Sequence, residues 1–189
     1  MLNKDFTELT QNVVKKISDQ YLLNVHNLQS DINHKFSVLC SDINILGERN
    51  EDLLNKAHFV EQDVIPLIQN LISFCINLIV MTKDIDPDYL INNHCLNTLI
   101  MKEKEYSKGK DRFDQFKEAA IILKCSPAQA LLGMMIKHYL SIDKIFKEKS
   151  LIEADMSFVM EKFGDLINYC FLLIGVLVEQ YQIDINKIK

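Results

Sequence analysis

The chain has 189 residues, of which 48% are hydrophobic and 25% charged, and its formal net charge is −5. These values exclude an intrinsically disordered protein, and they give no general attraction to nucleic acid, whose binding depends on clustered Lys and Arg. Only five Gly and three Pro occur. Because sheet-rich folds need many turns, this scarcity predicts an all-α protein made of long helices.

The cysteines and the apolar runs bear on the expected cellular location of the protein. The five cysteines are far apart, without a CxxC pair or a His/Cys cluster, so we expect free thiols in a reducing cytoplasm and no zinc framework. The N-terminus is polar and shows no signal peptide. The two most apolar runs, residues 66–81 and 166–178, are shorter than the roughly 20 residues that span a membrane. We therefore predict core helices, a cytoplasmic protein and no membrane partner.

The first 83 residues are predicted to form helices only. Apolar residues recur every three or four positions from Ile17 to Leu46, which predicts one helix of about forty residues ended by Gly47. Such a helix would pack along the whole domain or against another chain. A short charged helix is expected over 48–65. Pro66 then lies either in the first turn of the next helix or at a kink within a continuous one.

The second half begins at a break over residues 84–89, where Asp86 is expected to cap a helix that has Pro87 in its first turn. That helix should end near Tyr106, before a charged segment that contains Gly109. We predict the next helix over Asp111–Lys124.

Two long helices complete the predicted fold. Ser126, Pro127 and Gln129 form a strong helix start signal, and that helix should continue to about Lys147. The last helix is expected over roughly 156–181. We predict an N-terminal accessory or oligomerisation segment over 1–83 and a ligand-binding helical domain over 84–189.

Three stretches place polar residues where a helix should be apolar. In the first, "KEKEYSKGKDRFDQF" (102–116), Gly109 permits a turn that brings Tyr106, Asp111 and Arg112 together, and the following helix N-terminus favours anions. A solvated loop with inward-pointing phenylalanines is the alternative. In the second, Lys137, His138 and Ser141 share one side of a helix and could clamp a phosphate. A half-buried His–Ser contact is the alternative there.

The third stretch carries carboxylates on an otherwise apolar helix. Glu161, Asp165 and either Asn168 or Tyr169 recur at helical spacing, and Gly164 allows another helix or a ligand to come close to Asp165. Two carboxylates one turn apart can hold Mg²⁺ together with a substrate phosphate. Because burying an unpaired carboxylate costs several kcal/mol, Asp165 requires a partner, and the candidates are Lys137, Arg112 or a metal.

Taken together, "KEKEY", "DRFDQF", "SPAQALLGMMIKHYLSI" and "EKFGDLINYCFLL" resemble the phage and prophage nucleotide-modification-associated domain. That domain is a relative of the MazG-like all-α nucleoside triphosphate pyrophosphohydrolases. The resemblance covers residues of about 95–178, under half of the chain. It implies a MazG-like helical bundle, here preceded by the long N-terminal helix. It also implies a nucleotide ligand, assembly as a dimer or tetramer, and the host cytoplasm if the protein is viral.

The chain departs from the family pattern at the metal site. MazG-like enzymes use an ExxE pair and an ExxD pair to hold Mg²⁺ and cleave between the α- and β-phosphates. Asp165 matches the aspartate of ExxD, but Lys162 replaces its glutamate, and Lys137 and His138 stand on the helix that would carry ExxE. Nucleotide binding therefore carries over more safely than Mg²⁺-dependent hydrolysis, since two carboxylates have given way to cations.

The sequence thus yields two principal hypotheses. The first is a nucleotide-binding protein, with pyrophosphohydrolase activity left open, linked to phage nucleotide metabolism or DNA modification. The second is an oligomeric helical interaction protein with a vestigial pocket. A nucleic-acid partner is not expected. The expected catalytic and metal-binding residues are Glu161 and Asp165, and the expected substrate-binding residues are Lys104, Tyr106, Asp111, Arg112, Lys137, His138, Ser141, Asn168 and Tyr169.

Overall fold

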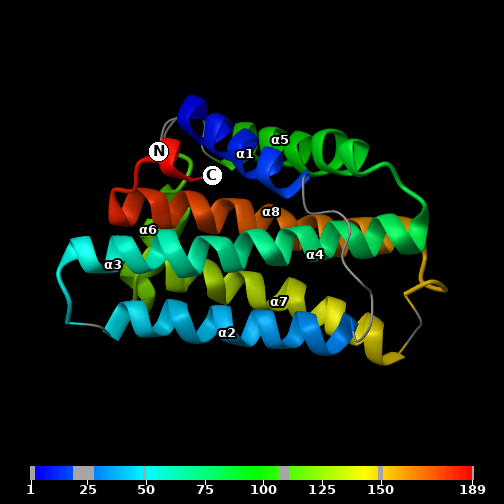
Figure 1. The fold of residues 1–189 in the computed structure, drawn as a ribbon, viewed down its shortest axis with the longest axis horizontal. Helices are drawn as coiled ribbons and strands as arrows, with labels where there is room; N and C mark the ends of the chain where they lie inside the picture. Colours follow the sequence, from blue (N-terminus) through cyan, green and yellow to red (C-terminus); the bar gives the residue numbers. More distant parts are fainter. Residues whose placement is uncertain (1–2, 19–27, 49, 107–110, 149–150, 189) are drawn as a thin grey trace.

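The computed structural model of the chain describes residues 3–18, 28–48, 50–106, 111–148 and 151–188. These residues form helices joined by short connections, and no strand occurs among them (Figure 1). The predicted all-α class is confirmed.

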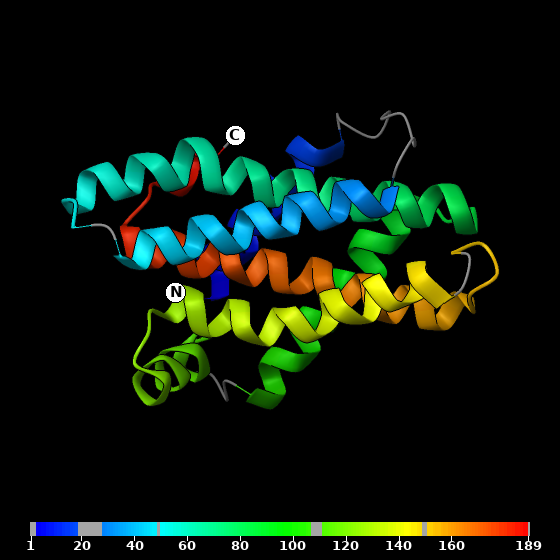
Figure 2. The ribbon, with the colours of Figure 1, turned by 90° about the horizontal axis from the view of Figure 1, so that it is seen from below.

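Four long helices form a bundle in which each packs against two others. They are α2 (Leu28–Glu48), α4 (Ile65–Lys83), α7 (Pro127–Glu148) and α8 (Met156–Tyr181). α8 packs against α4 and α7, and α2 packs against the same two helices from the other side (Figures 1 and 2). Helices from both sides of the proposed boundary at residue 83 therefore contribute to one hydrophobic core. The division into two segments stays a prediction.

The shorter helices surround this bundle. α1 (Asn3–Ser18) packs against α4 and α8. A π-helical segment, η2 (Tyr89–Leu96), packs on α8 and continues into α5 (Asn97–Tyr106), and α6 (Asp114–Leu123) packs on α7. The chain ends with a short 3₁₀ turn, η3 (Ile185–Lys187).

The prediction of one N-terminal helix of about forty residues is wrong. α1 and α2 are separate helices on different parts of the molecule, because α1 lies across α4 and α8 whereas α2 lies against α4 and α7 (Figure 1). α2 presents the predicted apolar residues to the core, including Ile32, Phe36 and Leu39, and α1 buries Phe6, Leu9 and Val13, which lie before the predicted stripe. Periodic apolar residues show which face is buried, and two helices in succession satisfy the same periodicity. The second helix ends at Glu48, one residue beyond the predicted stop.

Pro66 lies in the first turn of α4, inside a helical run that extends from Leu53 to Lys83. α3 (Leu53–Phe59) passes through a π-helical turn, η1 (Val60–Val64), directly into α4. Proline has no N–H to donate to the carbonyl four residues earlier, and a local π turn is one of the ways in which a helix accommodates this loss. The predicted place of Pro66 in the first turn of a helix is confirmed, and that helix continues without a break from the preceding one.

Two helical runs, Leu53–Lys83 and Met156–Tyr181, have the length and hydropathy of membrane-spanning helices. The bent pair α6–α7 would be a third if it formed one broken span. In the fold, 67% and 72% of the most apolar windows of the first two runs are buried against other helices. They form the bundle core, as predicted, and the cytoplasmic location stays a prediction.

Two of the helix starts follow the predicted capping chemistry. The Ser126 N–H donates to Gln129 Oε1 at 2.9 Å, and the Gln129 N–H donates to Ser126 Oγ at 3.2 Å, which is a complete capping box. Asp86 accepts from the Asp88 N–H at 2.8 Å. α6, however, begins at Asp114 and not at the predicted Asp111. The Asp111 carboxylate accepts from the Phe113 N–H at 3.0 Å and so forms a turn ahead of the helix.

A close approach at Gly175 fixes α1 and the 111–113 turn on α8. A Cβ atom at this position would lie 2.6 Å from Phe113 Cζ and 2.9 Å from Phe6 Cε2, and both rings are buried. The two rings meet edge to face with their centroids 5.8 Å apart. Only a glycine leaves room for this aromatic pair on α8.

We predict that Gly175→Ala lowers the free energy of unfolding by about 1–3 kcal/mol, because two buried rings must move. Gly133→Ala is the control: it lies in α7 with no atom within 4 Å of the added Cβ, and it should stabilise the protein by up to about 1 kcal/mol. Urea denaturation measures both. Equal stability of Gly175→Ala and the unmodified protein would contradict the close packing.

Candidate functional site

A cavity of about 400 Å³ lies beside α8, between α5, α7 and the start of α6. Its lining comes from segments far apart in the chain, which the bundle brings together. The lining residues are Leu99, Lys102, Glu103, Arg112, Gln115, Phe116, Lys137, His138, Asp165, Asn168, Tyr169 and Leu172. On α8 they follow helical spacing, so one face of that helix forms one wall.

The three polar stretches identified in the sequence all reach this cavity. The structure brings together six of the predicted site residues: Arg112, Lys137, His138, Asp165, Asn168 and Tyr169. Arg112 comes from the turn before α6, Lys137 and His138 from α7, and the other three from α8.

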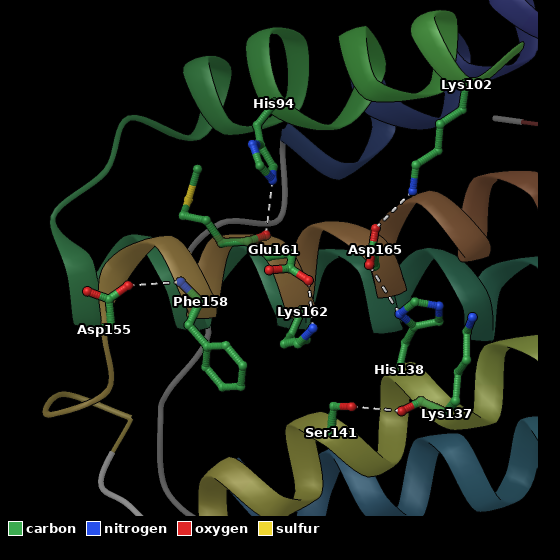
Figure 3. A network of polar contacts seen from close by, with 11 residues as sticks. His94, Lys102, Lys137, His138, Ser141, Asp155, Phe158, Glu161, Lys162 and Asp165 are labelled. Carbon is green, nitrogen blue, oxygen red and sulfur yellow. Dashed lines mark hydrogen bonds and ion pairs between the residues drawn. The ribbon is translucent and has the colours of Figure 1, made fainter. Parts of the chain in front are cut away.

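Three predicted residues lie elsewhere. The Glu161 side chain is 60% exposed and pairs with Lys162 at 2.6 Å, away from the cavity (Figure 3). The Ser141 hydroxyl donates to the Lys137 carbonyl of its own helix at 2.9 Å. Asp111 pairs with Lys117, which also pairs with Glu179. The side chains of Lys104 and Tyr106, and Gly109 itself, lie outside the described residues.

Asp165 has partners on two neighbouring helices, a lysine on one and a histidine ring on the other (Figure 3). Its carboxylate lies 3.2 Å from His138 Nδ1 on α7 and 3.4 Å from Lys102 Nζ on α5. Burial alone would raise the pKa of Asp165, but the hydrogen bond from His138 and the charge of Lys102 outweigh it and lower that pKa. Asp165 is therefore a carboxylate at neutral pH, and it ties α5 and α7 to α8.

His138 and Tyr169 form an aromatic wall of the cavity. Their ring centroids are 4.7 Å apart at an interplanar angle of 32°. Since His138 Nδ1 faces a carboxylate, it carries the proton in the neutral ring, and Nε2 is then an acceptor. Nε2 is buried and has no hydrogen-bond partner.

The two other cations on the cavity wall differ in their surroundings. Arg112 is buried: Nη2 lies 2.5 Å from Glu103 Oε2, and the guanidinium lies 4.3 Å from the centre of the Phe6 ring. Its charge is thus compensated within the fold. Lys137 is exposed, and its ammonium has no carboxylate partner among the described residues. Figure 3 shows its side chain extending along the ring of His138.

Asn168 is the one neutral amide that lines the cavity from α8. The residue is 5% exposed, and its Oδ1 atom has no hydrogen-bond partner. A buried polar atom without a partner costs about 1–3 kcal/mol.

Gly164 allows the close approach expected from the sequence. A Cβ atom there would lie 2.7 Å from the His94 ring. His94 Nε2, on η2, donates to the Met160 carbonyl oxygen on α8 at 3.1 Å (Figure 3). This contact holds η2 and the start of α5 against α8, and so positions the Lys102 wall.

Sequence reasoning missed the α5 wall of the cavity. Leu99, Lys102 and Glu103 follow one another at helical spacing on α5, a signal that the dense charge run conceals. Gln115 and Leu172 were also not among the expected ligand residues.

The residues present do not fit the Mg²⁺ site of the MazG-like pattern. Glu161 and Asp165 do not converge, and the two carboxylates on the cavity wall, Glu103 and Asp165, each face a cation. Within the described ranges, no group of three or more His, Cys, Asp or Glu side chains is placed to hold a metal ion.

Comparison of the chain with protein-family models, with curated proteins and with solved structures gave no match in any of the three. The functional interpretation therefore depends on the geometry of the cavity.

Asp111 provides a pH-dependent test of the turn beside the cavity. Burial opposes its ionisation, but hydrogen bonds from Lys117 and the Phe113 N–H lower its pKa to about 2. Because this value lies below the roughly 3.9 of an unfolded chain, the stability it contributes is present above about pH 4 and is lost as the pH falls toward 2.

Asp111→Asn should therefore lower the free energy of unfolding by roughly 1–2 kcal/mol at pH 7 and by much less near pH 2. Urea titrations at the two pH values measure the difference. Lys117→Met removes the same contact and should show the same pH dependence. A loss that is equal at both pH values would contradict the role of this ion pair.

Proposed function

We propose that this protein binds a nucleotide in the cavity beside α8. The observation that carries the proposal is Lys137, a cation with no carboxylate partner among the described residues, on the wall of a cavity that also presents the rings of His138 and Tyr169. An anionic phosphate and a planar base are the two chemical features of a nucleotide, and these side chains match each of them.

The size and character of the cavity support a small-molecule ligand. About 400 Å³ falls within the roughly 300–1,000 Å³ of small-molecule sites. Leu99, Phe116 and Leu172 supply apolar surface, while Asn168 and the cations supply a few fixed polar groups. Such a mixture is typical of sites that orient a ligand as well as bury it.

The resemblance to MazG-like proteins supports the same ligand class. The segments that carry the resemblance include the α5, α7 and α8 walls of the cavity. The proposal covers binding and not Mg²⁺-dependent hydrolysis, because the described carboxylates do not form a metal site. A role in phage nucleotide metabolism or DNA modification would follow if the ligand is a modified or deoxyribonucleotide.

A second proposal, self-association, is favoured by exposed apolar side chains at the end of α6. Three consecutive residues there, Ile121, Ile122 and Leu123, are 78%, 79% and 62% exposed. Adjacent apolar residues on a surface are typical of protein–protein contacts. A dimer or tetramer that buries them agrees with the assembly expected from the resemblance.

Thermal shift measurements with the common ribo- and deoxynucleotides test the binding proposal. A ligand at 100 times its dissociation constant adds about 2.7 kcal/mol, which raises the melting temperature by several degrees in a chain of this size. We expect such a shift with at least one nucleotide, and a smaller shift in Lys137→Gln, which lacks that cation.

Lys144→Gln is the matched control, since Lys144 is an exposed lysine on the same helix that does not line the cavity. It should retain the full shift. No shift of the unmodified protein with any nucleotide would overturn the proposal, as would equal losses in the two variants.

A further inference from the structure

The described wall of the cavity carries a small positive charge. Three permanent cations, Lys102, Arg112 and Lys137, face two carboxylates, Glu103 and Asp165. One positive charge remains on this part of the wall. The described wall therefore attracts an anion, and its excess charge is small.

The ion pairs show where this positive charge is located. Arg112 is held by Glu103 at 2.5 Å, and Asp165 is shared between His138 and Lys102 at 3.2 and 3.4 Å. Lys137 is the cation without a carboxylate among the described residues. Lys102 lies at the longer of the two Asp165 distances, and its side chain is 52% exposed, so its three N–H donors can also face a second anion while it stays paired with Asp165.

The charge of the ligand must match these cations. A phosphate monoester carries about −1.5 to −2 at neutral pH. A triphosphate, with two further ionised phosphates, carries about −3.5 to −4, which in proteins is commonly balanced by a divalent ion. The two carboxylates on the described wall, Glu103 and Asp165, are each already paired with a cation, so a divalent ion would have to displace Arg112 or Lys102 to reach them.

We infer that the ligand is a nucleoside monophosphate, bound without a divalent metal ion. This inference depends on the proposed nucleotide binding and narrows it to one charge class. Lys137, aided by Lys102, receives the phosphate. The rings of His138 and Tyr169 and the amide of Asn168 form the part of the wall that receives the base.

Isothermal titration calorimetry of the full chain tests this charge class. For the base that gives the largest thermal shift, the nucleoside and its mono-, di- and triphosphates are titrated in EDTA and again in Mg²⁺. We expect the monophosphate to bind at least about tenfold more tightly than the nucleoside. Its affinity should be the same within about twofold in EDTA and in Mg²⁺, and the triphosphate should not bind more tightly in either.

Two lysine variants test whether Lys137 is the residue that contacts the phosphate. Lys137→Gln should reduce the difference between monophosphate and nucleoside to below about threefold, whereas Lys144→Gln should leave it unchanged. Both lysines are exposed, so neither substitution disturbs the core.

The outcomes separate this inference from the proposed function. A triphosphate that binds about tenfold more tightly than the monophosphate, and only in Mg²⁺, would overturn the inference and leave nucleotide binding intact. A difference between monophosphate and nucleoside that survives in Lys137→Gln would overturn the assigned phosphate position. If no nucleoside or nucleotide binds, the proposed function fails and the inference fails with it.

Discussion

The carboxylate of Asp165, on the otherwise apolar helix α8, constrains how α5 and α7 pack against that helix. α8 is the central helix of the bundle, and Asp165 lies in its middle among buried residues. An unpaired charge there would cost several kcal/mol, so neighbouring helices must supply cations or hydrogen-bond donors. Lys102 of α5 supplies a cation at 3.4 Å, and His138 of α7 supplies a ring N–H at 3.2 Å. The helices that surround the cavity are thus held in place partly by the requirement to neutralise one side chain.

The ion pairs of Asp165 and Glu103 also limit which ligands the cavity can bind. Asp165 already engages His138 and Lys102, and Glu103 engages Arg112, so neither carboxylate is available to a metal ion without the loss of an ion pair. Lys137 has no such partner among the described residues. Positive charge and the rings of His138 and Tyr169 therefore meet on one wall, and this combination is the basis on which we propose a nucleoside monophosphate as the ligand.

Much of the fold and of the cavity was predictable from the sequence, because local chemistry dictated it. The capping box at Ser126 and the bounds of α8 follow from side chains within one turn of the helix end. Polar residues on apolar helices identified six residues of the cavity wall. Two predictions depended on tertiary structure and were harder to make. Apolar periodicity could not distinguish one long helix from α1 and α2 in succession. Helical spacing placed Glu161 near Asp165, but it could not show that α5 and α7 approach Asp165 alone while Glu161 stays exposed.

The most direct test of the cavity is an NMR titration of ¹⁵N-labelled protein with a nucleoside monophosphate. Binding beside α8 should shift the amide signals of residues 99–103, 137–138 and 165–172, which line the cavity, and leave the other helices nearly unchanged. A second and more open cavity of about 380 Å³, with Leu46, Lys56 and Gln180 in its lining, provides an internal control. Shifts confined to that region, or no shifts at all, would contradict nucleotide binding at the Lys137 cavity.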